Sequence, residues 1–427
     1  MRYIDLFAGC GGLSLGFHDA GWDGLFAIEK DPMAFDTLSA NMLDEKAPYP
    51  HFSDWPEWLP QQPHDIYDLV THEGIRTHLS KLRGSVDLVA GGPPCQGFSV
   101  GGARNGADQR NLLVGLFLEV VDLVRPRAVL IENVEGMSRR FESKPGLFVQ
   151  SPVDHVVEVL GRLGYAATTL VVDASLFGVP QLRRRLIVVG VSSPCLSLRP
   201  LLEDHLRASR LTVLESQGLS PGRLVTALEA LEDLDGARRV TCPDSPKYEA
   251  GTYKGKPHSP YAKSMRHGIL ASAIPDSHRF SKHGDRILGW YELAHRTQPP
   301  GRLSKDFMVS LGTKKDKKVL IDPHAPVSTI TTHPDEFIHY RHPRNVTVRE
   351  MARLQSFPDD FAFRGRYTIN GPRRRFDVAR CSQVGNAVPP LMAQGIARAL
   401  ESLLSDLSPP ASARHAAQPA ATPAPVG

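Results

Sequence analysis

One cysteine follows residues whose types restrict the backbone. Cys95 comes directly after the tetrapeptide Gly-Gly-Pro-Pro at 91–94. Glycine permits tight or left-handed backbone conformations, and proline fixes φ and removes a hydrogen-bond donor. The preceding segment 86–90 is typical of a short buried strand, so the thiol is expected just beyond a strand end, where α/β enzymes place their chemistry. Taken alone, this thiol could be a nucleophile or an ordinary buried cysteine.

A second group of residues suits the binding of a nucleoside. An apolar strand is expected at 3–7, and the turn Ala-Gly-Cys-Gly-Gly follows it at 8–12. Glycines let a ligand approach the backbone closely, and Glu29, at the end of the next strand, can accept hydrogen bonds from ribose hydroxyls. The turn is not G-x-G-x-x-G and offers no clear diphosphate site. These features favour S-adenosylmethionine over a dinucleotide.

Four further motifs place polar side chains beside expected strands and helices. Glu132 follows a strand, and the arginines at 183–185 precede one. A helix-capping acid and surface arginines are the alternative interpretations of these residues. The motifs are Glu-Asn-Val at 132–134, Gln-Leu-Arg-Arg-Arg at 181–185, Thr-Val-Arg-Glu-Met-Ala-Arg-Leu-Gln-Ser-Phe-Pro at 347–358 and Gln-Val-Gly-Asn-Ala-Val-Pro-Pro at 383–390.

Strand and helix patterns alternate through the first half of the chain. Repeated βα units with nearly continuous apolar strands predict an α/β fold with a doubly wound, mostly parallel sheet. Asp31 and Pro32 are expected to open a helix as N-cap and first helical residue. Strands are expected at 3–7, 25–29, 86–90, 128–132, 167–173 and 186–190, and helices at 13–20, 111–123, 153–163, 347–355 and 391–404.

The segment 191–344 breaks this alternation and predicts a second, irregular domain. Within 241–318, fifteen basic and seven acidic residues give a net charge of +8, whereas the whole chain of 427 residues carries +4. A local charge larger than that of the whole chain favours a site for a polyanion over a merely solvated surface.

The composition also bears on the compartment. The chain has five cysteines and no C-x-x-C pair, which disfavours a disulfide framework and a cysteine-based zinc site and predicts a cytoplasmic location. No apolar run is long enough to cross a membrane, and the first strand begins too early for a signal peptide. The Ala- and Pro-rich residues from 408 onward are expected to form a disordered tail.

Taken in order, the motifs between Tyr3 and about Ala399 resemble those of bacterial cytosine-C5 DNA methyltransferases of restriction–modification systems. The resemblance implies an S-adenosylmethionine-dependent methyltransferase fold with a second, smaller and irregular target-recognition domain. It assigns 1–190 plus 382–405 to a discontinuous catalytic and cofactor-binding domain, 191–381 to target recognition and 406–427 to the tail.

The same resemblance implies catalytic roles. Cys95, as thiolate, would add to C6 of cytosine, because C5 is a poor nucleophile until C6 carries a nucleophile. Glu132 would protonate or hydrogen-bond N3 and the 4-amino group of the base. Arg185, with Arg183 beside it, would hold O2 as a fixed cationic group.

The cofactor residues implied by the resemblance surround the first turn. Phe7 would lie against the adenine, Glu29 would bind the ribose, and Asp68 is the candidate for the adenine amino group, with Asp65 and Asp87 as open alternatives. No metal site is expected. The full set of expected cofactor-binding residues is Phe7, Gly9, Gly11, Glu29, Asp68, Pro93 and Asn386.

Double-stranded DNA is the expected partner, with the target cytosine flipped out of the stack and the glycine-rich segment 96–108 closing over it. The basic segment 241–318 would read the flanking sequence. The chain is expected to act as a monomer, away from membranes, and to protect DNA from a cognate restriction endonuclease. A tRNA cytosine-C5 methyltransferase and a non-catalytic DNA-binding regulator are the alternatives.

Overall fold

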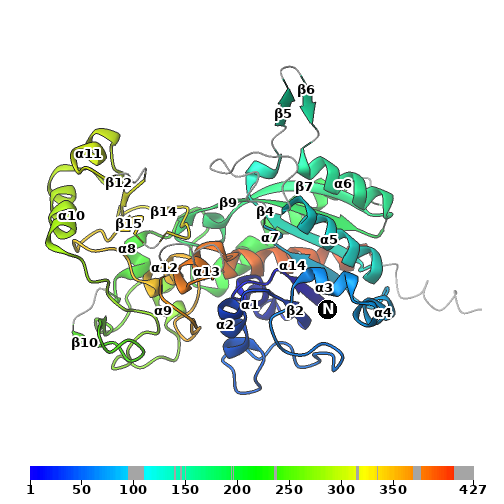
Figure 1. Ribbon diagram of the computed structural model, residues 1–427, viewed down its shortest axis with the longest axis horizontal. Helices are drawn as coiled ribbons and strands as arrows, with labels where there is room; N and C mark the ends of the chain where they lie inside the picture. The colour runs from blue at the N-terminus through cyan, green and yellow to red at the C-terminus, as the bar shows by residue number, and fades with distance from the viewer. Residues whose placement is uncertain are drawn as a thin grey trace, which may run out of the picture.

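The computed structural model consists of two lobes that lie side by side (Figure 1). We call the part built on the large sheet the sheet lobe. The second lobe is the part of the chain between helix α7 (Leu198–Ser216) and helix α14 (Pro390–Asp406). Cys95 and the segment 96–108 lie outside the described residues. The structure describes 1–94, 110–138, 141–144, 147–149, 151–193, 195, 197–234, 238–313, 317–333, 335–368 and 377–407.

A six-stranded sheet forms the centre of the sheet lobe, with strand order β2-β1-β3-β4-β9-β7. The first four strands in this order run parallel, and β9 runs antiparallel to both of its neighbours. The predicted mostly parallel α/β sheet is therefore confirmed. The strands are β1 (Arg2–Leu6), β2 (Asp23–Ile28), β3 (Leu88–Gly91), β4 (Ala128–Asn133), β7 (Ala166–Asp173) and β9 (Arg184–Val191).

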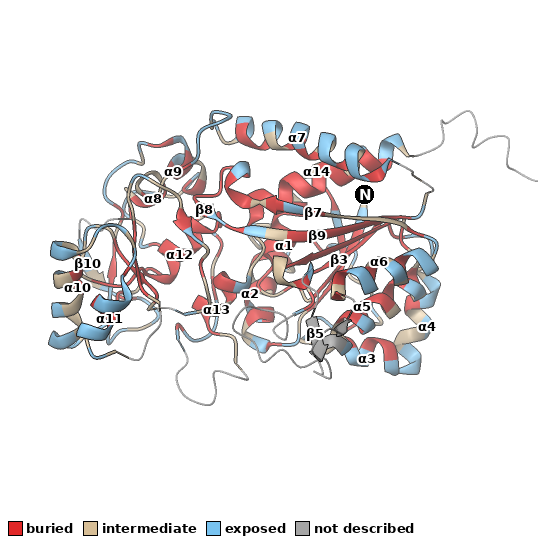
Figure 2. Cartoon of the chain, turned by 90° about the horizontal axis from the view of Figure 1, so that it is seen from above, coloured by how far each residue is buried: buried red, intermediate tan, exposed pale blue. Residues whose placement is uncertain are grey.

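Helices cover both faces of this sheet (Figure 2). Successive side chains of a strand point to opposite faces; in β4, Leu130 packs into one hydrophobic cluster and Ile131 into the other. Burial on both faces explains why the strands read as nearly continuous apolar runs. One face carries α1 (Gly12–Asp19), α7 (Leu198–Ser216) and α14 (Pro390–Asp406), and the other carries α3 (Ile66–Thr71), α4 (Glu73–Lys81), α5 (Arg110–Val124) and α6 (Pro152–Arg162).

The C-terminal helix α14 returns to the first helix of the chain. It packs against α1 at Gly16, where a Cβ atom would lie 2.5 Å from the Ala393 Cβ and 2.5 Å from the Pro390 carbonyl oxygen. Glycine is therefore needed for the two helix backbones to approach so closely. The sheet lobe is completed only by the last helix of the chain.

Helix α7 is a feature that the sequence pattern did not predict. Its 19 residues lie in the segment after residue 191, where the sequence predicts an irregular domain, yet they pack against α14 and β7 of the sheet lobe. Its apolar stripe (Leu198, Leu202, Leu206, Val213) is narrow, and most of its other residues are charged or polar. The domain division stays a prediction, but this packing favours a boundary after Ser216 over one at residue 191.

The second lobe is built from short elements, in agreement with its irregular sequence. Helix α2 (Pro32–Met42) of the sheet lobe contacts it at α13, and β8 (Gln181–Leu182) pairs with β14. A β5–β6 hairpin (Phe141–Lys144, Leu147–Val149) extends from the sheet lobe. The elements of the second lobe are α8 (Ala227–Leu231), β10 (Arg239–Thr241), β11 (Glu249–Gly251), α9 (Pro260–Met265), α10 (Asp285–Thr297), β12 (Gly301–Arg302), α11 (Lys305–Ser310), β13 (Val319–Leu320), β14 (Val327–Ser328), β15 (Phe337–Ile338), α12 (Val348–Leu354) and α13 (Arg380–Asn386).

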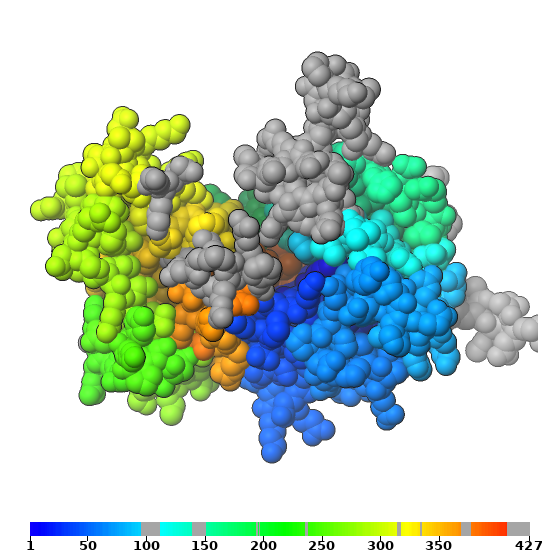
Figure 3. Space-filling model, in the orientation of Figure 1, coloured from blue at the N-terminus to red at the C-terminus, as the bar shows by residue number. Residues whose placement is uncertain are grey.

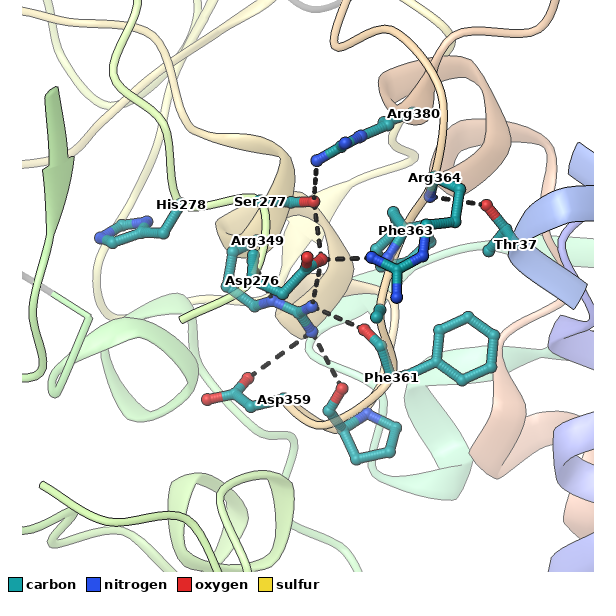
Figure 4. A network of polar contacts seen from close by, with 12 residues as sticks. Thr37, Asp276, Ser277, His278, Arg349, Asp359, Phe361, Phe363, Arg364 and Arg380 are labelled. Carbon is teal, nitrogen blue, oxygen red and sulfur yellow. Dashed lines mark hydrogen bonds and ion pairs between the residues drawn. The ribbon is translucent and has the colours of Figure 1, made fainter. Parts of the chain in front are cut away.

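Buried ion pairs hold α12 in the second lobe. The Thr347 side chain and Glu350 form a capping box at its start, which confirms the predicted capped helix. The Arg349 guanidinium donates to Asp276 and to the carbonyl oxygens of Pro358 and Phe361 (Figure 4). Because these arginine donors are used inside the fold, they serve the structure of the lobe and not a ligand.

Candidate active site

A cavity of about 490 Å³ lies at the carboxyl ends of the parallel strands. Its walls come from the turn after β1, from the residues just after β2 and β3, from the end of β4, and from the segments around 183–185 and 378–388. Figure 3 shows residues of the N-terminal elements, in blue, meeting the orange residues of α13 between the two lobes. Carboxyl ends of parallel strands meet at one edge of a sheet, so motifs far apart in the sequence converge there.

The turn after β1 and the end of β2 form one end of the cavity. Phe7 and Gly9 both line it and both have positive φ, 61° and 59°. The backbone N–H groups of Gly9 and Asp31 donate to the two carboxylate oxygens of Glu29, at 2.8 and 2.7 Å. Burial raises the pKa of Glu29, against the opposing effect of these hydrogen bonds. The acid is thereby fixed at the cavity wall with lone pairs left for hydroxyl donors.

Two of the expected cofactor residues lie away from this cavity lining. Asp68 is exposed on α3, whereas Asp65, the N-cap of that helix, lines the cavity and pairs with Lys30 at 2.5 Å. Gly11 faces α2, because a Cβ atom there would lie 2.8 Å from Leu38 Cδ1. The placement favours Asp65 over Asp68 as the acid nearest a bound ligand.

Asp5 is a lining residue to which the motifs gave no role. It lies in β1, is 1% exposed, and accepts a 2.5 Å hydrogen bond from Ser14 Oγ. Burial raises its pKa to about 7, although the Ser14 hydrogen bond lowers it, and the charge of Glu29 adds to the rise. The position of Asp5 in a strand could not show that it lines the cavity, since a buried polar residue in a strand usually serves only to bond a structural partner.

The other end of the cavity carries an ion pair. Arg185 Nε lies 2.9 Å from Glu132 Oε1, and the two side chains are only 12% and 11% exposed. Gly92 lies so close to this pair that a Cβ atom there would be 3.3 Å from Glu132 Oε2. Both side chains line the cavity, so an acid and a fixed planar cation face the same space.

Asn133 positions the turn that precedes Cys95. Its Nδ2 donates to the Pro93 carbonyl oxygen at 2.8 Å. Pro93 and Pro94 therefore lie beside Glu132, and both line the cavity. The Glu-Asn-Val motif identified Glu132 but gave no role to its second residue; the signal available was a side chain with both a donor and an acceptor at a strand end.

The Arg183 side chain holds backbone segments of the site together through hydrogen bonds. It is 1% exposed, and its terminal nitrogens donate to the carbonyl oxygens of Ile330, Gly385 and Ala387 at 3.2, 3.0 and 3.0 Å. Burial lowers its pKa, and the positive charge of Arg185 adds to this effect. Arg183 therefore shapes the wall next to Asn386, an exposed residue that lines the cavity.

Two glutamines complete this junction between the lobes. Gln355 Nε2 donates to the Ala387 carbonyl oxygen at 2.7 Å and to that of Val384 at 3.2 Å. Gln181 Nε2 donates to Gln355 Oε1 and to the Leu354 carbonyl oxygen. Both side chains are fully buried. Residues of three separate motifs thus hold one another through backbone carbonyl groups.

The chemistry of the lining bears on the cofactor. Three carboxyl groups, those of Asp5, Glu29 and Asp65, and a single cation, Lys30, lie at the end of the cavity formed by β1 and β2, and this excess of acids disfavours a diphosphate. A ligand with hydroxyl groups and a positive charge fits this set, and at Gly9 a Cβ atom would meet no heavy atom within 4 Å, which leaves room for it. The residues present therefore fit S-adenosylmethionine.

Two further observations concern only the described residues. They contain no group of three or more His, Cys, Asp or Glu side chains that could hold a metal ion. They also contain no helix with the length and apolar character needed to cross a membrane.

The fold, with a cavity at the carboxyl ends of its parallel strands, is typical of an α/β enzyme, and comparisons with known proteins identify its class. The sequence model of the C-5 cytosine-specific DNA methylase family matches residues 1–402. The type II methyltransferase M.DdeI of Desulfomicrobium norvegicum is 31% identical, over 93% of this chain and 88% of its own. M.AgeI of Thalassovita gelatinovora, also a type II methyltransferase, is 31% identical, over 95% of this chain and 100% of its own.

A solved structure agrees. A crystal structure of an E. coli protein assigned as a prophage-encoded DNA modification methyltransferase aligns with a TM-score of 0.61 and 25% identity, over 95% of this chain and 99% of that one. The chain belongs to the C-5 cytosine-specific DNA methylase family, and it is a DNA (cytosine-5-)-methyltransferase.

Proposed function

We propose that this enzyme methylates C5 of a cytosine that has been flipped out of a specific sequence in double-stranded DNA, through a covalent bond between Cys95 Sγ and C6. The observation that carries the proposal is the Glu132–Arg185 pair, which faces a cavity beside the Pro93–Pro94 turn. Cys95 is the residue that follows this turn in the sequence, which makes it the candidate nucleophile.

Each residue has a distinct task in this proposal. The Cys95 thiolate adds to C6, and the electron pair of the C5–C6 double bond becomes available at C5. Glu132 hydrogen-bonds N3 and the 4-amino group, and Arg185 hydrogen-bonds O2, so that negative charge on the ring is stabilised as it develops. After methylation, loss of the C5 proton to a base expels the thiolate and restores the double bond. Asn133 and Arg183 hold the backbone around these groups and are positioning residues.

S-adenosylmethionine supplies the methyl group when bound. Glu29 would hold the ribose hydroxyls, Phe7 would contact the adenine, and Asp65 would accept a hydrogen bond from the adenine amino group. Gly9, Pro93 and Asn386 would shape the remaining walls. Pairing with a restriction endonuclease is supported by the relatives described as type II methyltransferases. Action as a monomer in the cytoplasm stays a prediction.

The test uses tritiated S-adenosylmethionine with duplex DNA or with tRNA. Label is expected on DNA alone, on cytosine C5, and the Cys95→Ala variant is expected to lose transfer while still binding the cofactor, as measured by calorimetry. Cys195→Ala is the matched control, because Cys195 is partly buried and lies outside the cavity lining. Label on tRNA only would contradict the DNA substrate, and turnover by Cys95→Ala would contradict the nucleophile.

A further inference from the structure

Arginine and tyrosine side chains alternate in a stack on the second lobe. The guanidinium carbon of Arg279 lies 4.1 Å from the ring centroid of Tyr248 and 3.8 Å from that of Tyr367. Arg380 lies over Tyr367 as well, at 4.2 Å. We call Tyr248, Arg279, Tyr367 and Arg380 the arginine–tyrosine stack. Two tyrosine rings thus fix the plane of one guanidinium group.

The two arginines of the stack differ in how their charge is balanced. Arg380 is buried, lies 2.7 Å from an Asp244 carboxylate oxygen, and donates to Ser277 Oγ and the Gly365 carbonyl oxygen. Arg279 is half-buried, and among the described residues its guanidinium donates only to Ser245 Oγ, at 3.3 Å, with no carboxylate in ion-pair range. Arg380 is therefore a structural cation, whereas Arg279 keeps most of its five donors unused within the described fold.

The geometry of Arg279 selects a kind of ligand. Because tyrosine rings lie 4.1 and 3.8 Å from the guanidinium carbon, we expect acceptors to approach the N–H groups along the edge of the group, where its planar fork can donate in parallel to two of them. Duplex DNA offers such acceptor pairs in the phosphate oxygens and in O6 and N7 of guanine. Holding the side chain in place beforehand lowers the entropy lost on binding.

The stack also lies in a suitable place. It starts at α13, where Arg380 is flanked by Val378 and Gln383, two residues that line the cavity. From there it leads into the segment 241–318, where the positive charge of the chain is concentrated. Lys282, which is exposed, extends the positive charge by lying 5.4 Å from the Tyr248 ring centroid.

We propose that Arg279 is a DNA-contacting residue that donates two hydrogen bonds to an acceptor pair on the duplex next to the flipped cytosine. This inference rests on the proposed function. The chemistry is the same for a phosphate group and for a guanine edge, and the two sources give different experimental results.

The experiment compares full-length wild type with Arg279→Met and Arg279→Lys. Arg239→Met is the matched control, because Arg239 is also stacked on an aromatic ring (Phe280, 5.0 Å) but is paired with Glu249 at 2.8 Å. The probe is a duplex library with a randomised core, methylated with S-adenosylmethionine, deaminated with bisulfite and sequenced. Binding to the duplex that wild type methylates best is then measured from 50 to 200 mM salt.

Arg279→Met is expected to weaken binding roughly five- to a hundredfold, whereas Arg239→Met leaves it unchanged. For a phosphate contact, the salt slope falls by about 1, the methylated sequence is unchanged, and Arg279→Lys restores most of the affinity. For a guanine contact, one position of the methylated sequence becomes degenerate and the salt slope is unchanged. Arg279→Lys then restores neither the affinity nor the sequence preference, because lysine lacks the planar fork.

A second measurement uses the wild-type enzyme and does not depend on the folding of a variant. DNA is expected to protect Arg279, but not Arg239, from modification by phenylglyoxal, as read by mass spectrometry. Equal modification of Arg279 with and without DNA, or wild-type affinity and sequence preference in Arg279→Met, would overturn the inference. If wild type itself methylates no duplex in the library, the proposed function fails instead, so the two failures are distinguishable.

Discussion

At the scale of single residues, Asp5 couples the stability of the fold to pH. In the folded chain its pKa is about 7, whereas an unfolded aspartate titrates near its ordinary value of about 4. Between these two values the folded state binds the proton that the unfolded state has lost. The contribution of Asp5 to stability therefore decreases as pH rises from about 4 to 7 and is constant above that.

Replacing Asp5 with Asn removes this dependence. The free energy of unfolding of Asp5→Asn, relative to wild type, is expected to rise by roughly 1.4 kcal/mol for each pH unit between about pH 5 and pH 7, and to level off above that. Urea unfolding at several pH values measures it. Asp23→Asn, at an exposed position in β2, is the control and should follow wild type. A difference between Asp5→Asn and wild type that does not change with pH would contradict this prediction.

The placement of residues at the site was predictable where a motif lies at the end or the start of a strand. Glu29, Glu132 and Arg185 face the cavity as expected, because strand register determines the side to which they point. Asp68 could not be separated from Asp65 in this way, because the pattern did not define where the short helix α3 begins, and a start three residues later would make Asp68 its N-cap. The thiol of Cys95 stays a prediction, because it lies outside the described residues.

At the scale of elements, the strands were predictable, as were well-buried helices such as α12, whereas helices with largely exposed surfaces were not. Strands β1, β3 and β4 are buried on both faces, which produces continuous apolar runs that need no knowledge of their neighbours. Helices α7 and α4 expose most of their surface, so their apolar residues are too few to stand out. The elements of the second lobe depend on long-range polar contacts, and these leave no periodic pattern in the sequence.

The most consequential of these contacts surround α12. The Arg353 guanidinium is fully buried between Asp233 and Asp359, with Nε 2.6 Å from Asp359 and Nη1 3.0 Å from Asp233. Removing one member of a buried ionic network leaves the others charged and unpaired, which costs more than the pair contributes.

Arg353→Met is therefore expected to lower the free energy of unfolding by roughly 3–5 kcal/mol, because the buried carboxylates of Asp233 and Asp359 lose their shared cation and keep only Arg266 and Arg349. Thermal and urea unfolding measure the loss. Arg207→Met, which removes an exposed pair with Asp204 in α7, should change stability by no more than about 1 kcal/mol. Equal effects of the two substitutions would show that the α12 network does not stabilise the second lobe.

At the scale of the whole molecule, the cations of the second lobe are of two kinds, those buried inside the fold and those exposed on its surface. Arg266 pairs with Asp233 inside the fold, and Lys318 is buried beside Tyr291, so neither is available to a partner. Exposed lysines such as Lys247 and Lys282 remain. The net charge counted from the sequence is therefore larger than the positive charge exposed on the surface of the second lobe, but the exposed charge is still positive and lies in the same segment.

Replacing the exposed lysines Lys247, Lys254, Lys256 and Lys282 with Gln is expected to weaken DNA binding and its salt dependence. Each lost phosphate contact should reduce the slope of log K against log salt by about 0.9. Fluorescence anisotropy with duplex DNA measures the slope, and Lys81→Gln in α4 of the sheet lobe is the control. An unchanged slope would mean that these lysines do not lie on the DNA.

The packing of α14 on α1 has a consequence for synthesis. Helix α1 leaves the ribosome long before the surface it packs against at Gly16, because Gln394 of α14 follows Asp19 of α1 by 375 residues. At about 5–20 residues per second, tens of seconds pass before Leu13 and Phe17 of α1 have their final neighbours. A chain whose synthesis has not yet reached α14 therefore exposes apolar surface and needs protection from aggregation, and the complete sheet lobe forms only once α14 has been made.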